Sequence, residues 1–362
     1  MITDRRISAF RRKLAQEDIL AFLVTGISNV RYLTGFEDTF DDDANVVALL
    51  TPEITRVYTD FRYEEAVCEA AEGTPWVVYA PTDSLYTVLC DDLAALGIEQ
   101  LALESSVVYG RFRFLSERFG GKVYVVDQWV ESLRQTKEAA EVERIAAAAA
   151  LADRTMEHVL GMLEPGVIER DIVLEIEVFM RTNGAEGVAF PPIVASGLNS
   201  SRPHAGVTER AIGAGDFVTI DLGARVQGYC SDLTRTVVMG SASTRQREIY
   251  SAVYDANAAA IEAVHGGISG MDLDAVARDL LTKRGFGTQF GHGLGHGVGL
   301  QIHEMPSVNS RWRDSIPAGV VITIEPGVYI PEFGGVRIED LVLVEDGGCT
   351  VLSESPRELT EI

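Results

Sequence analysis

The sequence predicts an N-terminal α/β domain followed by a larger α+β domain. The chain has 362 residues, 46% of them hydrophobic, which is enough for two cores because a domain commonly holds roughly 150 residues. Strand and helix patterns alternate through residue 126, as in an α/β domain. The composition changes at Val130, so we place the boundary near Asp127 and expect domains at 1–127 and 128–362.

The N-terminal domain is expected to open with an amphipathic helix over Met1–Leu14. Acidic residues interrupt its basic face and no apolar secretory segment follows, so we do not expect a targeting peptide. The acidic segment Glu37–Asp43 lacks the glycine and closing glutamate of an EF-hand loop, which favours a solvated loop. Strands are expected at Ile19–Thr25, Val46–Leu50, Thr55–Tyr58, Trp76–Tyr79, Leu101–Leu103 and Lys122–Val126, and helices at Tyr63–Glu72, Leu85–Leu96 and Arg111–Phe119.

The second domain is expected to begin with an Ala-rich helix over Lys137–Met162, ended by a Pro-Gly pair. A helix over Glu169–Thr182 follows and stops at an Asn-Gly pair. Further helices are expected at Gln246–His265 and Leu273–Arg284. Strands bounded by Gly and Pro fill most of the remainder and end the chain.

Charge and cysteine content exclude several classes of protein. The formal net charge is −23, which argues against nucleic acid or an anionic membrane surface as a partner, because such binding needs clustered Lys and Arg. The four cysteines are scattered without CxxC spacing, so free thiols in a reducing compartment are expected. No run of 18 apolar residues occurs. We therefore expect a cytoplasmic protein.

Two aspartates stand at strand positions that are normally apolar. In FVTIDLG (217–223), alternation places Asp221 on the face opposite the apolar side chains. A hairpin-like connection lets Asp232 return beside Asp221 on an antiparallel strand. Carboxylates on adjacent strands repel, so either a metal ion bridges them or one of them is protonated.

A glycine-rich segment, GHGLGHGVGLQIHE (291–304), holds three of the six histidines: His292, His296 and His303. Its closely spaced glycines exclude a helix, because each costs about 1 kcal/mol in a helix interior. Glycine also lets the backbone approach a ligand closely. The GxGxxG fingerprint is absent, so phosphate binding has little support.

Two further strands carry isolated glutamates. Glu325 lies on the otherwise apolar strand VITIEPGVY, and Glu339 shares a face with Arg337 in GVRIEDLVLV. Four such segments in one domain predict a site for two divalent metal ions, with Mn²⁺ first and Co²⁺ or Zn²⁺ as alternatives. A pair of metal ions can lower the pKa of a water molecule and stabilise an oxyanion. The predicted ligands are Asp221, Asp232, His296, Glu325 and Glu339.

At these residues the sequence resembles the pita-bread metallopeptidases, the family of aminopeptidase P, prolidase, methionine aminopeptidase and the metal-free creatinase. The ordered segments that carry the resemblance are TIDLG, YCSDLTRT, GHGLGH, HE-P, TIEPGVYI and GVRIED, and in the first domain NVRYLTGF and TDFRYEEA. The resemblance covers essentially the whole chain. It implies a creatinase/prolidase-type domain at 1–127 and a pita-bread catalytic domain at 128–362. It also implies the same five ligands, whose presence argues against the metal-free branch.

The resemblance further implies an enzyme that cleaves bonds before proline in proline-containing peptides, acting as a homodimer. His292, His303, Glu325 and Glu339 would then be catalytic, the two histidines as oxyanion contacts and the two glutamates as proton carriers. His204, Tyr329 and Arg337 would lie against the substrate.

Four hypotheses about the function remain open at this point. We place an Xaa-Pro aminopeptidase first and an Xaa-Pro dipeptidase second, because no segment that recognises a free C-terminus is identifiable. A metal-independent C–N hydrolase of creatinase type would keep its activity in a chelator. A non-catalytic peptide-binding module would leave the metal site empty at saturating Mn²⁺.

Overall fold

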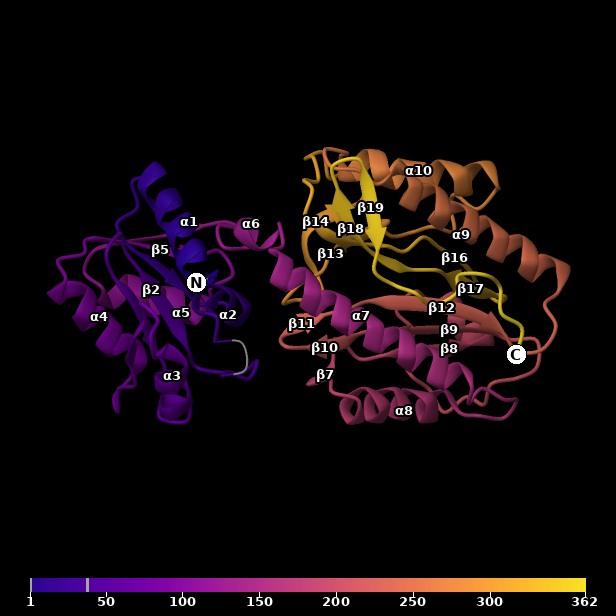
Figure 1. The fold of residues 1–362 in the computed structure, drawn as a ribbon, viewed down its shortest axis with the longest axis horizontal. Coiled ribbons are helices and arrows are strands. Elements are labelled where there is room, and N and C mark those ends of the chain that lie inside the picture. Colours follow the sequence, from indigo (N-terminus) through magenta and orange to yellow (C-terminus); the bar gives the residue numbers. More distant parts are fainter. Residues whose placement is uncertain (1, 37–38) are drawn as a thin grey trace. The chain divides into compact units, whose positions relative to one another are not determined.

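The computed structural model describes residues 2–36 and 39–362, which form two compact units, Met1–Arg134 and Gln135–Ile362 (Figure 1). The division falls after Arg134, beyond Asp127, because a short helix still packs with the first unit. In that helix Arg134 Nη1 donates to Asn29 Oδ1 at 2.6 Å, and Lys13 Nζ donates to Ser132 Oγ at 2.9 Å.

The first unit is an α/β domain, as the sequence predicts. Its six-stranded sheet has the order β4-β3-β2-β1-β5-β6, in which β2 runs antiparallel to β1 and β3 and the other pairs are parallel. Leucines of the central strands pack against Leu89 and Leu93 of the helix that follows β4. The elements are α1 (Ile2–Gln16), β1 (Phe22–Val24), α2 (Ile27–Thr34), β2 (Val47–Leu50), β3 (Thr55–Tyr58), α3 (Glu64–Ala71), β4 (Val77–Tyr79), α4 (Leu85–Ala95), β5 (Gln100–Glu104), α5 (Tyr109–Arg118), β6 (Lys122–Val126) and α6 (Glu131–Arg134).

Helix α2 has no counterpart among the predicted elements. It is only eight residues long, and polar side chains such as that of Arg31 are buried in it, so the apolar residues alone do not predict it. Gly35 ends it at φ 75°. In the acidic segment that follows, Glu37 and Asp38 lie outside the described residues. Asp42 forms an ion pair with Arg31 at 2.9 Å, so this part of the segment also has a structural contact.

The second unit is an α+β domain in which two helix pairs cover strands from opposite sides (Figure 1). Apolar side chains of α7 and α8 pack on the sheet β12-β9-β8. Those of α9 and α10 pack on the sheet β14-β13-β15-β18-β19 and on the hairpin β16-β17. The helices are α7 (Ala139–Leu160), α8 (Glu169–Thr182), α9 (Thr244–Ala263) and α10 (Gly270–Lys283).

The strands of the second unit carry most of the candidate site. They are β7 (Gly187–Val188), β8 (Ile193–Ser196), β9 (Phe217–Leu222), β10 (Ala224–Val226), β11 (Tyr229–Cys230), β12 (Leu233–Val238), β13 (Gly295–Gly297), β14 (Glu304–Val308), β15 (Val321–Ile324), β16 (Gly327–Ile330), β17 (Gly334–Arg337), β18 (Asp340–Glu345) and β19 (Gly348–Val351), with a 3₁₀ turn, η1, at Gly197–Ser201. A backbone bridge between Thr234 and Glu339 joins the two strand systems. None of the helices in the described residues combines the length and apolar composition that crossing a membrane requires.

Candidate active site

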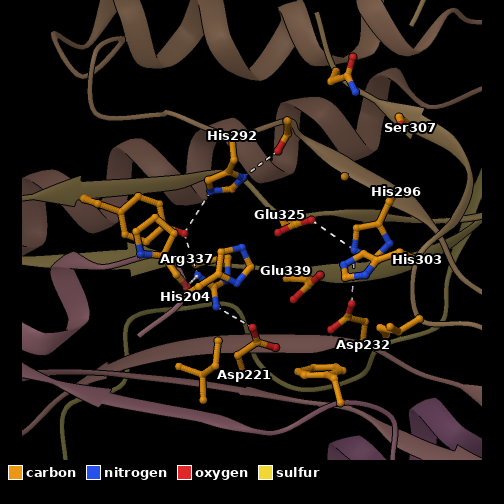
Figure 2. A pocket seen from close by; sticks show the side chains of 18 of the residues that line it. His204, Asp221, Asp232, His292, His296, His303, Ser307, Glu325, Arg337 and Glu339 are labelled. Atoms are coloured by element: carbon orange, nitrogen blue, oxygen red, sulfur yellow. Dashed lines mark hydrogen bonds and ion pairs between the residues drawn. The ribbon is translucent and has the colours of Figure 1, made fainter. Parts of the chain in front are cut away.

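One cavity of about 460 Å³ brings together every residue that the sequence analysis assigned to the site. Its wall contains His204, Asp221, Asp232, His292, His296, His303, Glu325, Tyr329, Arg337 and Glu339. Figure 2 shows the labelled carboxylates and imidazoles converging on its centre. The cavity lies wholly within the second unit.

The carboxylates reach this cavity from strand ends on both sides of the bridge between Thr234 and Glu339. Strands β9 and β12 are antiparallel, with Asp221 opposite Thr234, and Asp232 directly precedes β12. From the other strand system, Glu325 directly follows β15 and Glu339 directly precedes β18. The two systems therefore meet at their acidic residues.

Glycines allow β13 to carry His296 into this meeting point. A Cβ atom on Gly295 would lie 2.0 Å from the carbonyl oxygen of Thr323, and one on Gly297 would lie 2.2 Å from that of Met305. Neither contact is tolerable for a side-chain carbon, so the neighbouring strands can pack this closely only against glycine. The glycine-rich segment is thus required for packing, and His296 is held between β14 and β15.

Asp232, His296 and Glu339 each place one potential ligand atom within 4.8 Å of the others. The Nε2 atom of His296 lies 3.6 Å from Asp232 Oδ2 and 3.5 Å from Glu325 Oε1. These separations are too long for hydrogen bonds but match donors arranged around a shared cation. Asp221 lies beside them, with Oδ2 accepting from Arg337 Nη2 at 2.6 Å. Its Oδ1 is buried and has no hydrogen-bond partner among the residues that the structure describes.

Burial makes the negative charges of this site unfavourable without a cation. It is the main reason that the pKa of Asp232 and that of Glu339 lie well above their ordinary values, and the neighbouring carboxylates raise both further. Burial also raises the pKa of Glu325 to about 8, although Arg337 acts in the opposite direction. Bound dications or protons must offset this repulsion.

The tautomer of His296 favours a metal ion over protons. Its Nδ1 lies 3.1 Å from the carbonyl oxygen of Gly297, which can only accept a hydrogen bond, so Nδ1 carries the proton. Burial and the nearby His303 lower the pKa of His296 to about 4, so the ring is neutral at pH 7. Its Nε2 lone pair therefore faces the carboxylates. Together with the unpartnered Oδ1 of Asp221, this set of donors fits divalent cations.

Arg337 is almost fully occupied by protein acceptors. Its Nε donates to Thr234 Oγ1 at 3.0 Å, its Nη1 donates to Tyr329 Oη at 2.8 Å and to a backbone carbonyl, and its Nη2 binds Asp221. The hydroxyl of Thr234 in turn donates a hydrogen bond to Glu339 Oε2 at 2.6 Å. The guanidinium thus orders two predicted ligands and has little capacity left for another anion.

The two candidate oxyanion contacts, His292 and His303, differ in whether their ring nitrogens are already hydrogen-bonded. His292 Nδ1 donates to the Gly293 carbonyl at 2.8 Å, and its Nε2 lies 3.1 Å from the hydroxyl of Tyr329. Burial raises the pKa of Tyr329, so this hydroxyl keeps its proton and donates a hydrogen bond to His292 Nε2. Within the described part of the chain, the ring of His303 makes no hydrogen bond, and it lies edge-on to His296 with centroids 4.3 Å apart.

Sequence reasoning missed the remaining wall of the cavity. Its apolar part comes from Phe190, Pro191, Ile193 and Ile302, and Ser307 and Asn309 add polar groups. None of these has an ionisable side chain, so no chemical signal marked them. Thr234 could have been found, because strand alternation places it on the same face as Asp232.

Comparisons with known proteins agree with this geometry. Residues 143–346 match Metallopeptidase family M24, and residues 6–136 match the Creatinase/Prolidase N-terminal domain. The chain is 36% identical to an Xaa-Pro dipeptidase of Pyrococcus horikoshii over 99% of both chains. Among solved structures, it resembles an Xaa-Pro dipeptidase from Bacillus anthracis, with a TM-score of 0.94 and 36% identity over 99% of this chain and 100% of that one.

An X-Pro aminopeptidase from Thermotoga maritima is also similar in structure, with a TM-score of 0.88 and 34% identity over 98% of this chain and 99% of that one. The likenesses extend over both units, and the family match covers more than half of the chain. They confirm the creatinase-type first domain and the pita-bread second domain expected from the sequence. The chain belongs to metallopeptidase family M24.

Proposed function

We propose that this protein is an Xaa-Pro dipeptidase that uses two divalent metal ions. The observation that carries the proposal is the buried group of four carboxylates around a neutral imidazole, with the His296 lone pair and Asp221 Oδ1 left for a cation. The names of two full-length relatives, the dipeptidases of Pyrococcus horikoshii and Bacillus anthracis, support the same activity.

The ligands we assign are Asp221, Asp232, His296, Glu325 and Glu339. Hard oxygen donors with one imidazole suit Mn²⁺, which we place ahead of Co²⁺ and Zn²⁺. When bound, the cations supply Lewis acidity toward the peptide carbonyl and lower the pKa of water.

Each remaining side chain receives a role from its contacts. We assign the oxyanion contact to His303, because both ring nitrogens of His292 are engaged by Gly293 and Tyr329. His292 instead holds the Tyr329 hydroxyl in place. Arg337 keeps Asp221 and Thr234 in position, and His204 lies on the cavity wall where a substrate would pass.

Proton transfer falls to the glutamates. We assign the transfer of a proton to the leaving proline nitrogen to Glu325, whose carboxylate accepts only a long hydrogen bond, from Thr323 Oγ1 at 3.4 Å. Glu339 is held by the short hydrogen bond from Thr234 and is less free to move. Apolar groups of Phe190 and Ile302 line the same cavity and lower the polarity around the charged groups, which strengthens the interactions between them.

The comparisons favour the dipeptidase over the aminopeptidase that the sequence alone placed first, although the Thermotoga maritima structure keeps the second activity as a candidate. Hydrolysis of Ala-Pro and Ala-Pro-Ala by the Mn²⁺-loaded protein decides between them. A dipeptidase cleaves Ala-Pro and leaves the tripeptide intact. Faster release of alanine from Ala-Pro-Ala would assign the aminopeptidase activity instead.

The same assay, with a chelator and a measurement of Mn²⁺ binding, also tests the two remaining hypotheses. Activity that survives dialysis against a chelator would indicate a metal-free hydrolase of creatinase type. A protein that binds no Mn²⁺ and cleaves neither peptide would be a binding module. We also propose that the protein is a cytoplasmic homodimer, which sedimentation of the purified chain and fractionation of cells would test.

A further inference from the structure

A buried glutamate outside the cavity wall anchors the segment that carries His204. Glu169 is the first residue of α8 and is 0% exposed. The segment, residues 196–210, leaves β8, makes the turn η1 and returns to the start of α8, with His204 exposed between its ends. We name it the His204 segment.

The carboxylate of Glu169 accepts hydrogen bonds from three places along this segment. At its start, the backbone nitrogen and the hydroxyl of Ser196 bind Oε1 at 2.6 and 2.8 Å. In the middle, Asn199 Nδ2 binds Oε2 at 3.1 Å, and near its end Thr208 Oγ1 binds the same oxygen at 2.5 Å. One side chain therefore closes the segment into a loop.

The loop is joined to the site as well as to α8. The amide of Asn199 also donates to the carbonyl oxygen of Gly206 at 3.2 Å, across the residues that flank His204. Gly335, two residues before Arg337, donates its backbone N–H to Ser200 Oγ at 2.9 Å. Arg337 Nη1 itself donates to the carbonyl oxygen of Pro203 at 3.2 Å. The placement of His204 thus depends on bonds that meet at Glu169.

We propose that Glu169 is the positioning residue for His204 and thereby for substrate binding. This inference rests on the dipeptidase function proposed above. A fully buried carboxylate is costly unless its oxygens are hydrogen-bonded, and here four donors satisfy it. The start of a helix adds a favourable field for the negative charge. A neutral side chain of equal size provides neither the charge nor the full set of acceptors.

The test uses Glu169→Gln in the Mn²⁺-loaded protein, with Glu177→Gln on the same helix as the matched control. The glutamine oxygen can still accept from Ser196, but its NH₂ group would face the amide of Asn199, donor against donor. We expect KM for Ala-Pro to rise about tenfold, with a much smaller change in kcat, because the substrate contact is displaced while the metal ligands are not. Glu177→Gln should match the wild type.

A double-mutant cycle shows whether Glu169 acts through His204. In a His204→Ala background, Glu169→Gln should add little to KM. The same rise in both backgrounds would overturn the proposal. Two readouts are independent of activity: amide hydrogen exchange should quicken in residues 196–210 only, and the His204 ring resonance, assigned by its loss in His204→Ala, should shift. Unchanged exchange and an unchanged resonance would also overturn it.

Two further variants keep the proposal testable if Glu169→Gln does not fold. Thr208→Val removes one donor without changing shape and should reproduce the effect in part, whereas Thr208→Ser keeps the hydroxyl and should behave as the wild type. Equal KM values for Thr208→Val, Thr208→Ser and the wild type would contradict the proposal. If the wild type cleaves no Xaa-Pro peptide, the proposed function fails, and exchange and the His204 resonance still decide whether Glu169 positions this residue.

Discussion

Replacing Thr234 with valine tests how strongly the protein scaffold controls the proposed ligand Glu339. Thr234 is 0% exposed, and its hydroxyl donates to Glu339 Oε2 at 2.6 Å while accepting from Arg337 Nε at 3.0 Å. Valine has nearly the same shape, so the change removes both bonds and creates no cavity. It also buries an unpartnered guanidinium N–H.

The structure sets the size of the effect. A hydrogen bond to a charged group contributes about 1.5–3 kcal/mol, and an unsatisfied buried donor costs about 1–3 kcal/mol. Because the side chains around Thr234 can relax in part, we expect a loss of about 3 kcal/mol in the free energy of unfolding of the metal-free protein. Removing a group that orients a metal ligand should also lower Mn²⁺ affinity or kcat/KM about 10- to 100-fold.

Three measurements check this prediction: urea unfolding of the metal-free protein, Mn²⁺ titration by calorimetry, and the kinetics of Ala-Pro hydrolysis. Thr234→Ser retains the hydroxyl and should stay close to the wild type. Thr155→Val is the control for a buried threonine remote from the site, since its hydroxyl only donates to Leu151 O within α7. If Thr234→Val bound Mn²⁺ and turned over substrate normally, the role given to Thr234 would be wrong.

The remaining predictions concern the ligands, the pH dependence and the glycines. Asp232→Ala and His296→Ala should each abolish Ala-Pro hydrolysis while circular dichroism shows an intact fold; full activity of either variant would refute the ligand assignment. The pKa of Glu325, raised from 4.5 to about 8 mainly by burial, means that the folded metal-free protein holds this proton more tightly than the unfolded chain. This contribution to stability is therefore fully present below pH 4.5 and is lost as the pH rises through about 8. The melting temperature of the metal-free protein should fall between these two pH values. An unchanged or rising melting temperature would contradict this expectation. Gly295→Ala should destabilise the protein by about 3 kcal/mol or more and remove activity, because its Cβ would lie 2.0 Å from Thr323 O. Gly291→Ala is the control, because a Cβ atom at this position meets no atom within 4 Å. Equal melting temperatures for the two variants would show that the strands can separate without loss of stability.

Local sequence patterns were sufficient to predict most of the fold. The helix over Glu169–Thr182 has the same bounds in the sequence analysis and in the structure, because a Gly- and Pro-containing segment precedes it and an Asn-Gly pair follows it. Helix α2 was missed because it is only eight residues long and buries polar side chains such as those of Arg31 and Thr34, whose burial no apolar pattern predicts. The first unit extends to Arg134 because of contacts with Asn29, distant in sequence.

The side chains that can perform the chemistry are identifiable from the amino-acid sequence alone. Carboxylates at strand positions and a histidine among glycines are local features, and together they predict a metal site. How these side chains are hydrogen-bonded to one another is visible only in the folded protein. Thr234 and Glu339 are hydrogen-bonded although 105 positions apart, and Arg337 reaches Asp221 across 116 positions. The tertiary structure also assigned Glu169 to the His204 segment. Such pairings depend on the packing of the sheets against each other, which strand alternation and spacing do not encode.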